Sequence, residues 1–219
     1  MRDHDSGGQR ELPRLMLISD VGRVGQDRFL RVLDESWSAG LRMLQVREPG
    51  SSAEDMRALI EVILLGAPDD AIVLVNRRID VAIEFRLGGV HIGGGDPSKV
   101  REARALLSQG SLVGYSAHQR GEIDRAHLEG GDYVTYSPIF GALSKRHPLP
   151  PVGAEGLREV CEEAKTPVFA LGGVTPRHVH SVRAAGAHGV AVIGAILDAD
   201  DPRGCVREFL SEWAASEME

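Results

Sequence analysis

Short, continuous apolar runs recur along the chain and alternate with segments whose apolar residues return every three or four positions. A continuous apolar run bounded by glycine, proline or polar residues is typical of a strand covered on both faces, as in a parallel sheet. The helical spacing is typical of an amphipathic helix that packs on such a sheet. We therefore predict strands at Leu15–Ser19, Arg42–Val46, Ala71–Val75, Gly89–Ile92, Ser111–Gly114, Asp132–Thr135, Val168–Leu171 and Gly189–Ile193.

The segments between these runs are predicted to be helices. One begins after Ser51 or Ser52, either of which can cap it, and the apolar residues from Met56 to Ile63 then fall on one face. Further helical spacing is found at Phe29–Trp37, Ile79–Phe85, Pro97–Leu107, Glu122–Leu128, around Val160 and Ala164, at Pro176–Ala185 and at Cys205–Trp213.

The alternation amounts to about eight strand–helix units of ~25 residues, and it predicts an α/β fold: a (β/α)8 TIM barrel in a single domain. We assign the barrel to residues 14–215, with residues 1–13 as a disordered N-terminal extension and 216–219 as a tail. A doubly wound open sheet is the alternative. It is less favoured because no glycine-rich dinucleotide fingerprint follows the first strand.

Glycines follow two neighbouring predicted strands near the end of the chain. Gly172 and Gly173 come after Val168–Leu171, and Gly194 comes after Gly189–Ile193. Glycine at such a position lets a ligand oxygen approach bare backbone N–H groups, and the loops after strands seven and eight form the usual phosphate site of a barrel. These glycines therefore predict a phosphate site, and tight turns alone are the alternative.

Composition excludes several classes of function. A hydrophobic content of 42% is ordinary for a globular protein, and a net charge of −7 argues against non-specific nucleic-acid binding. Cys161 and Cys205 lie far apart, without disulfide-framework or metal spacing. The first residues lack the apolar core of a signal peptide, and no apolar run is long enough to span a bilayer. We therefore expect a cytoplasmic enzyme without nucleic-acid or membrane partners, and a homo-oligomer remains open.

Polar residues gather where the predicted strands end, which is where a barrel carries its chemistry. They are Gln45, Arg47, Asn76, Arg77, His91, Asp96, Ser116, His118, Ser144 and Lys145. Arg47 and Lys145 suit a polyanion, because a guanidinium binds phosphate bidentately and a lysine supplies a point charge. A surface salt bridge between Arg47 and Glu48 is the alternative.

Two of these residues have competing interpretations. Asp96 follows three glycines and suits Mg²⁺ held together with phosphate oxygens, but it also suits the start of a helix before Pro97. His118 suits a general acid or base near neutral pH, although loop histidines are usually solvated. For the others we expect His91 to be a satisfied core histidine and Ser116 to donate a hydrogen bond to a substrate.

An ordered series of motifs resembles the thiamine-phosphate synthase superfamily, which includes the related thiazole tautomerases. The series covers about Leu15 to Trp213, nearly the whole chain. It consists of QVRE at 45–48, VNRR at 75–78, GVHIGGGD at 89–96, GYSAH at 114–118, SPIF with SK at 137–145, ALGGV at 170–174 and AVIGAI at 191–196. A single motif such as ALGGV is weak, whereas the ordered series is much more specific.

The resemblance implies an enzyme of thiamin biosynthesis that joins a pyrimidine-methyl diphosphate to a thiazole phosphate and releases diphosphate with Mg²⁺. It implies diphosphate contacts at Gln45, Arg47, Asn76 and Lys145. It also implies Mg²⁺ at Asp96, a pyrimidine contact at Ser116, and thiazole-phosphate contacts at Ser144, Gly173, Ile193 and Gly194. The catalytic residues expected on this basis are Ser116, His118 and Lys145.

The chain departs from the family pattern at four positions. Pro49 stands where the pattern has lysine, Gly94 where it has glutamine, and Ala142 where it has threonine. Arg77 stands where the pattern has an aspartate that binds Mg²⁺. Since this last difference changes the local charge by two units, we expect weaker Mg²⁺ binding and a contact between Arg77 and the diphosphate.

Three functions follow from these features. A divergent synthase is favoured by Asp96, Arg47, Ser116 and Lys145. A thiazole tautomerase needs only the phosphate site and a base, and His118 is the family position for that base. A non-catalytic barrel that binds thiamin intermediates is the third. The long segment at residues 137–152 is predicted to be a lid.

Overall fold

The computed structural model describes residues 11–141 and 150–215. Its eight parallel strands form one closed barrel, in which each strand pairs with the next along the chain and β8 pairs with β1. The strands are β1 Leu15–Ile18, β2 Met43–Val46, β3 Ile72–Asn76, β4 Gly89–Ile92, β5 Leu112–Ala117, β6 Tyr133–Tyr136, β7 Val168–Leu171 and β8 Gly189–Val192. The predicted (β/α)8 barrel is confirmed.

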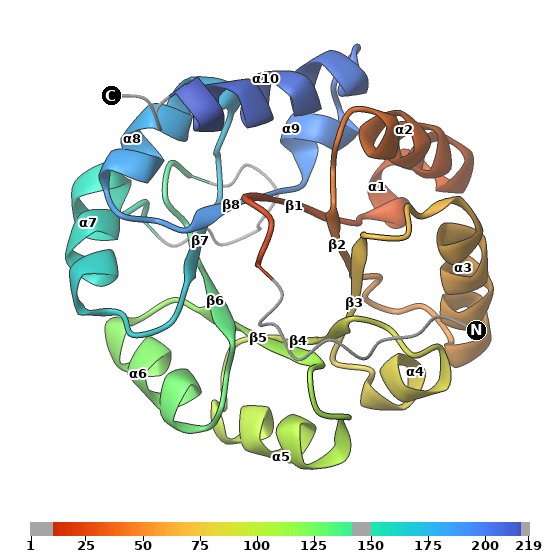
Figure 1. The fold of residues 1–219 in the computed structure, drawn as a ribbon, viewed down its shortest axis with the longest axis horizontal. Helices are drawn as coiled ribbons and strands as arrows, with labels where there is room; N and C mark the ends of the chain where they lie inside the picture. The colour runs from red at the N-terminus through yellow and green to blue at the C-terminus, as the bar shows by residue number, and fades with distance from the viewer. Residues whose placement is uncertain (1–10, 142–149, 216–219) are drawn as a thin grey trace.

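Helices surround the strands on the outside of the ring (Figure 1). They are α1 Val21–Val24, α2 Gln26–Ser38, α3 Ala53–Gly66, α4 Ile79–Glu84, α5 Ser98–Leu106, α6 Arg120–Leu128, α7 Gly153–Glu163, the 3-10 turn η1 Pro176–His178, α8 Val179–Ala184, α9 Gly194–Leu197 and α10 Pro202–Ala215. Ser52 caps α3, since its hydroxyl accepts the Asp55 backbone N–H at 3.0 Å. Among the described residues, no helix is long and apolar enough to cross a membrane.

The interior of the barrel is a small apolar core that lies apart from the larger core under the helices. It consists of Leu12, Met16, Ile18, Met43, Ile72, Leu74, Tyr133, Phe169 and Ala191. Gly114 is required inside it, because a Cβ at this position would lie 2.1 Å from Cζ of Tyr133 and 2.6 Å from Nδ1 of His91. The lower interior is therefore filled with side chains, and chemistry is confined to the carboxyl ends of the strands.

Leu12 lies at the amino end of the barrel, within the segment predicted to be a disordered extension. It is only 9% exposed, and its carbonyl pairs with Nε2 of His188 at 2.9 Å. Arg14 donates to Nδ1 of the same ring at 2.9 Å. The packed chain therefore includes residues before the predicted start at 14, because Leu12 supplies an apolar side chain that covers the open end of the barrel.

The structure corrects some element boundaries. We predicted β5 to end at Gly114, but it runs to Ala117, because Ser116 pairs with Thr135 and Ala117 pairs with Tyr136 of β6. The short helices α1 and α9 were not predicted, since four residues give too little periodicity to recognise. Cys161 and Cys205 are free, as predicted.

Candidate active site

A layer of polar side chains lies above the apolar interior at the carboxyl ends of the strands. Successive side chains of a strand point to opposite faces, so residues two positions beyond an interior residue also face inward. Gln45 follows Met43 in this way, Asn76 follows Leu74, and Thr135 follows Tyr133. Backbone pairing then places Asn76 beside His91 and Ser116 beside Thr135. The predicted residues Gln45, Asn76 and Ser116 therefore belong to one layer.

His91 organises this layer and is the satisfied core histidine that we predicted. Its Nδ1 lies 3.0 Å from the hydroxyl of Tyr133, and its Nε2 lies 2.8 Å from Oγ of Ser116. Burial lowers its pKa to about 3, and the positive charge of Arg47 acts in the same direction. A neutral ring donates one hydrogen bond and accepts the other, so His91 fixes the position of the Ser116 hydroxyl.

We expect His91 to make the protein less stable as the pH falls. Its pKa of about 3 in the folded state lies below the ordinary 6.5, so the unfolded state binds more protons between these values. The free energy of unfolding should fall by about 1.4 kcal/mol per pH unit from this residue alone. Burial also lowers the pKa of His178 and His188, which adds to the effect with the same sign.

Denaturant unfolding of the protein and of His91→Gln, between about pH 6.5 and about pH 5, measures this contribution above the range where most carboxylates titrate. The variant should show the shallower dependence on pH. Parallel dependences for the two proteins would contradict a neutral, buried His91.

His118 lies next to the layer with one ring nitrogen fixed. Its Nδ1 lies 2.8 Å from the carbonyl oxygen of Ser137, an acceptor, so Nδ1 carries the proton and Nε2 keeps a lone pair. The backbone N–H of His118 donates to Glu122 at 2.7 Å. A Cβ at Gly94 would lie 3.5 Å from Nε2, which places this nitrogen beside the loop after β4. The arrangement suits a proton acceptor or a hydrogen-bond acceptor.

Arg47 is held in place through its backbone, and no hydrogen bond of its side chain is found in the described part of the chain. Its N–H donates to Oγ of Ser19 at 2.8 Å, and the Ser19 hydroxyl donates to Glu48. Glu48 also accepts the Val21 N–H at 2.9 Å, and burial raises its pKa. Within residues 11–141 and 150–215, Arg47 forms no ion pair, so the alternative of a salt bridge with Glu48 is not what the structure contains.

Two buried polar atoms in the layer have no hydrogen-bond partner in the described part of the chain: Oε1 of Gln45 and Oγ1 of Thr135. Buried polar atoms nearly always have a hydrogen-bond partner. Two such atoms without one, at the same end of the barrel, suggest that a ligand or a water molecule supplies the missing hydrogen bonds. Thr135 was not among the predicted site residues. Its alternation with Tyr133 in the run DYVT was the available signal.

A cavity of about 400 Å³ lies at the ends of β3 and β4, next to the first turns of α4 and α5. Its lining residues are Arg77, Ile79, Ile92, Gly93, Gly94, Asp96, Lys99 and Glu102. Arg77 is exposed and has φ of 63°, which is uncommon for a residue with a side chain. Predicted substrate-binding and metal-binding residues, Arg77 and Asp96, thus line the same cavity.

Asp96 interacts with the start of α5. Its carboxylate accepts the Ser98 N–H at 3.0 Å and the Ser98 hydroxyl at 2.8 Å, and these bonds lower its pKa. This is the helix-start role that we considered beside the metal role. The described ranges contain no group of three His, Cys, Asp or Glu residues that could hold a metal ion.

The predicted phosphate glycines lie at the carboxyl ends of the neighbouring strands β7 and β8. Gly172 and Gly173 have φ of 98° and 67°, and Gly194 begins α9. Gly173 is exposed, and a Cβ there would lie 2.3 Å from the carbonyl oxygen of Gly141. Ile193 precedes α9 directly. The geometry therefore agrees with the predicted phosphate site in position, and bound phosphate remains a prediction.

The segment after β6 is tied to the glycine turn. The Ile139 N–H donates to the carbonyl of Leu171 at 3.0 Å, and the Phe140 N–H donates to that of Gly172 at 2.9 Å. The Phe140 ring stacks on His178, with ring centroids 4.1 Å apart. Ser144 and Lys145, predicted to contact phosphate, lie outside the described residues, as does half of the predicted lid at 137–152.

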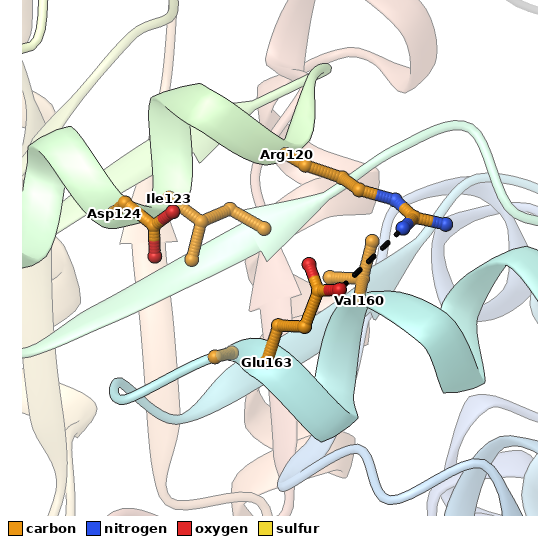
Figure 2. A pocket seen from close by; sticks show the side chains of 6 residues that line it. Arg120, Ile123, Asp124, Val160 and Glu163 are labelled. Atoms are coloured by element: carbon orange, nitrogen blue, oxygen red, sulfur yellow. Dashed lines mark ion pairs between the residues drawn. The ribbon is translucent and has the colours of Figure 1, made fainter.

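A second, very small cavity lies between α6 and α7 on the outside of the barrel. It has a volume of about 10 Å³, room for about one water molecule. Arg120 of α6 reaches toward Glu163 of α7, 3.9 Å away, as Figure 2 shows, and Arg120 also pairs with Glu159. It is therefore a helix-packing feature and not a substrate site.

Comparisons of the sequence with known proteins agree on one family. The family model described as thiamine monophosphate synthase matches residues 15–196. A thiamine-phosphate synthase of Synechococcus sp. (strain WH7803) is 36% identical over 206 residues, which is 92% of this chain and 57% of that protein. A thiamine-phosphate synthase of Corynebacterium efficiens is 31% identical, with 92% of this chain and 96% of that protein covered.

A solved structure of a protein with the same type of name has a similar fold. The thiamine phosphate pyrophosphorylase from Pyrococcus furiosus superposes with a TM-score of 0.77 at 25% identity. The superposition covers 95% of this chain and 98% of that chain. The chain thus spans little more than half of the Synechococcus relative but almost all of the Pyrococcus one.

Proposed function

The chain belongs to the thiamine monophosphate synthase family, and we propose that it condenses a pyrimidine-methyl diphosphate with a thiazole phosphate, releasing diphosphate. The observation that carries the proposal is that two different features suited to bind anions lie at one end of the barrel. Arg47 lies beside the polar layer, and the glycine turns lie after β7 and β8. A reaction that joins a diphosphate to a monophosphate needs two such places.

The proposed step is a substitution at the methylene carbon of the pyrimidine. The bond between that carbon and the diphosphate oxygen breaks, and the diphosphate leaves with the electron pair. The lone pair of the thiazole nitrogen forms the new bond to carbon, which leaves the positive charge on the thiazolium ring. Since no proton is transferred, the site must supply positive charge to the leaving group and orientation to both substrates.

Individual residues have roles that follow from their positions. Arg47 and Gln45 border the place for the pyrimidine diphosphate, with Asn76 on the neighbouring strand. The unpaired amide oxygen of Gln45 is an acceptor, so its partner is a donor such as an N–H of the pyrimidine and not a phosphate oxygen. Ser116, oriented by His91, is placed to hydrogen-bond the pyrimidine ring. The N–H groups around Gly173 and Gly194 bind the thiazole phosphate. From the sequence alone, we also propose that Ser144 contacts the thiazole phosphate and that Lys145 contacts the diphosphate.

Mg²⁺, which the family resemblance implies, would neutralise charge on the departing diphosphate when bound. The described residues do not fit an ion held by the protein alone. Asp96 is a single carboxylate already hydrogen-bonded to Ser98, and no three ligands meet in the described ranges. None of the residue roles proposed here depends on a metal ion, and Mg²⁺ stays a prediction, as do a cytoplasmic location and a homo-oligomer.

Thiazole tautomerase activity is the second candidate, because Nε2 of His118 is left with a free lone pair. A tautomerase transfers a proton and needs such a base, whereas the proposed condensation does not. The Synechococcus and Corynebacterium relatives are both named thiamine-phosphate synthases, which favours the condensation.

His118→Asn distinguishes the two reactions. Asparagine cannot accept the proton, so loss of a general base should lower tautomerase turnover by about 100-fold or more. Under the synthase proposal, the variant should keep at least about a tenth of the rate of diphosphate release, because His118 only borders the site. The measurements are diphosphate release with both synthase substrates and proton exchange on thiazole carboxylate phosphate in deuterated water.

Proton exchange by the unchanged protein, lost in His118→Asn, together with no diphosphate release would replace the synthase proposal with the tautomerase. Background rates in both assays would favour a non-catalytic binder of thiamin intermediates.

A further inference from the structure

We propose that Arg77 forms a metal-independent subsite for a diphosphate anion in the cavity at the ends of β3 and β4. The inference rests on the proposed function in one respect: the anion is the diphosphate group that the reaction releases. It goes beyond that function because it assigns to a guanidinium the charge neutralisation that a divalent cation would otherwise supply.

The backbone holds Arg77 in an unusual conformation. Its φ of 63° lies in the left-handed region, which side chains other than glycine seldom occupy. The conformation is fixed on both sides: the Arg77 N–H donates to the carbonyl of His91 at 2.9 Å, and the Arg77 carbonyl accepts the Ile79 N–H at 3.1 Å. A strained conformation that neighbouring hydrogen bonds enforce is a recurrent feature of ligand sites.

The guanidinium of Arg77 packs against Gly93, where the absence of a side chain leaves room for it. A Cβ at this position would lie 2.6 Å from both Nε and Nη2 of Arg77 and 3.0 Å from Cζ. Any other residue at 93 would therefore displace the guanidinium. The head group of Arg77 packs on bare backbone at the carboxyl end of β4, beside the cavity that both residues line.

The other charged residues of the cavity already have partners. Lys99 donates to both carboxylate oxygens of Glu102, at 2.8 and 2.9 Å, and Asp96 accepts two hydrogen bonds from Ser98. Across the described ranges, Arg77 is the lining charge for which no ion pair or side-chain hydrogen bond is found. Lys99 and Glu102 neutralise each other, so Arg77 is the lining cation that no carboxylate pairs with in the described ranges, and it offers several free donors.

The chemistry of the group selects the ligand. A guanidinium presents a planar set of N–H donors that matches two phosphate oxygens, and it stays protonated at any physiological pH. The cavity volume of about 400 Å³ falls within the usual range for small-molecule sites. A diphosphate bound here is neutralised by Arg77 after β3, and Arg47 follows β2, the strand that pairs with β3 in the ring.

The test is calorimetric binding of inorganic diphosphate to the full chain, first with EDTA and then with Mg²⁺. The first variant is Arg77→Gly, which removes the guanidinium, and glycine readily adopts φ of 63°. The second is Arg77→Lys, which keeps the positive charge but cannot donate two parallel hydrogen bonds to the anion. The matched control is Arg86→Gly, since Arg86 is an exposed arginine with φ of 50° outside the cavity lining.

We expect the unchanged protein to bind diphosphate in EDTA within about tenfold of its affinity in Mg²⁺. Arg77→Gly should weaken binding in EDTA by about 10- to 100-fold, with Arg77→Lys intermediate and Arg86→Gly unaffected. Binding that is undetectable in EDTA, or equal in the protein and Arg77→Gly, would overturn the subsite.

The outcome separates this inference from the proposed function. Diphosphate binding that needs Arg77, without condensation of the two substrates, supports the subsite and refutes the synthase. Condensation that requires Mg²⁺ equally in the protein and in Arg77→Gly supports the synthase and refutes the subsite.

Discussion

Gly173→Ala is expected to abolish most of the activity, with kcat/KM for the thiazole phosphate reduced by about 100-fold or more. The residue has φ of 67°, and the added Cβ would lie 2.3 Å from the carbonyl oxygen of Gly141 and 2.9 Å from that of Phe140. These contacts are with backbone, so the turn after β7 or the segment after β6 must move. A displacement of about 1 Å at a positioning element is enough for a loss of this size.

Gly153→Ala is the matched control for this prediction. Gly153 has φ of 69°, but a Cβ there would meet nothing within 4 Å. It therefore carries the same backbone strain, of order 1 kcal/mol, without the collision. Both variants should unfold at lower denaturant concentration, whereas only Gly173→Ala should lose binding of the thiazole phosphate. Normal binding by Gly173→Ala would show that the glycine turn is not the phosphate site.

Arg47→Ala is expected to lower kcat/KM for the pyrimidine diphosphate by about 100-fold. Charge-assisted hydrogen bonds to an anion contribute about 1.5–3 kcal/mol each, and a group that binds the departing charge contributes most in the transition state. Arg47→Lys should recover part of the rate, because charge is restored without the bidentate geometry. Steady-state kinetics with the diphosphate substrate varied measures both effects.

Arg42→Ala is the control at the opposite end of the same strand. Arg42 pairs with the exposed Asp70 and donates to the carbonyls of Trp37 and Leu41, so its loss affects stability but not the site. If Arg47→Ala and Arg42→Ala had the same kcat/KM, Arg47 would have no part in binding the diphosphate.

Arg47→Ala also changes the buried histidine. The charge of Arg47 contributes to the lowered pKa of His91, although burial is the larger cause. In Arg47→Ala the pKa of His91 should therefore rise toward its ordinary value and still remain below it. This readout reports on the electrostatics of the polar layer without requiring turnover.

Much of the barrel was predictable from the sequence, because buried parallel strands leave continuous apolar runs. The runs Gly89–Ile92 and Val168–Leu171 match β4 and β7 residue for residue. β5 was cut short because Ser116, a polar residue, sits within the strand and is hydrogen-bonded to His91. A local pattern cannot reveal that the partner of a polar side chain is on a neighbouring strand.

The location of the candidate site was predictable, but the contacts between its side chains were not. The rule that chemistry lies at the carboxyl ends of the strands found Gln45, Asn76 and Ser116. The hydrogen bond from Ser19 to Glu48 joins the segments that follow β1 and β2, and it directs the Glu48 carboxylate to Ser19 instead of Arg47. Likewise, the guanidinium of Arg77 packs against the backbone at Gly93, a contact between two loops that come together only in the folded chain.

The measurement that tests the account most directly is the product analysis of purified protein incubated with the pyrimidine-methyl diphosphate and the thiazole phosphate. We predict that thiamine phosphate and diphosphate form in equal amounts, and that omission of either substrate abolishes both. Diphosphate formed without the thiazole phosphate, or neither product with both substrates present, would contradict the proposed condensation.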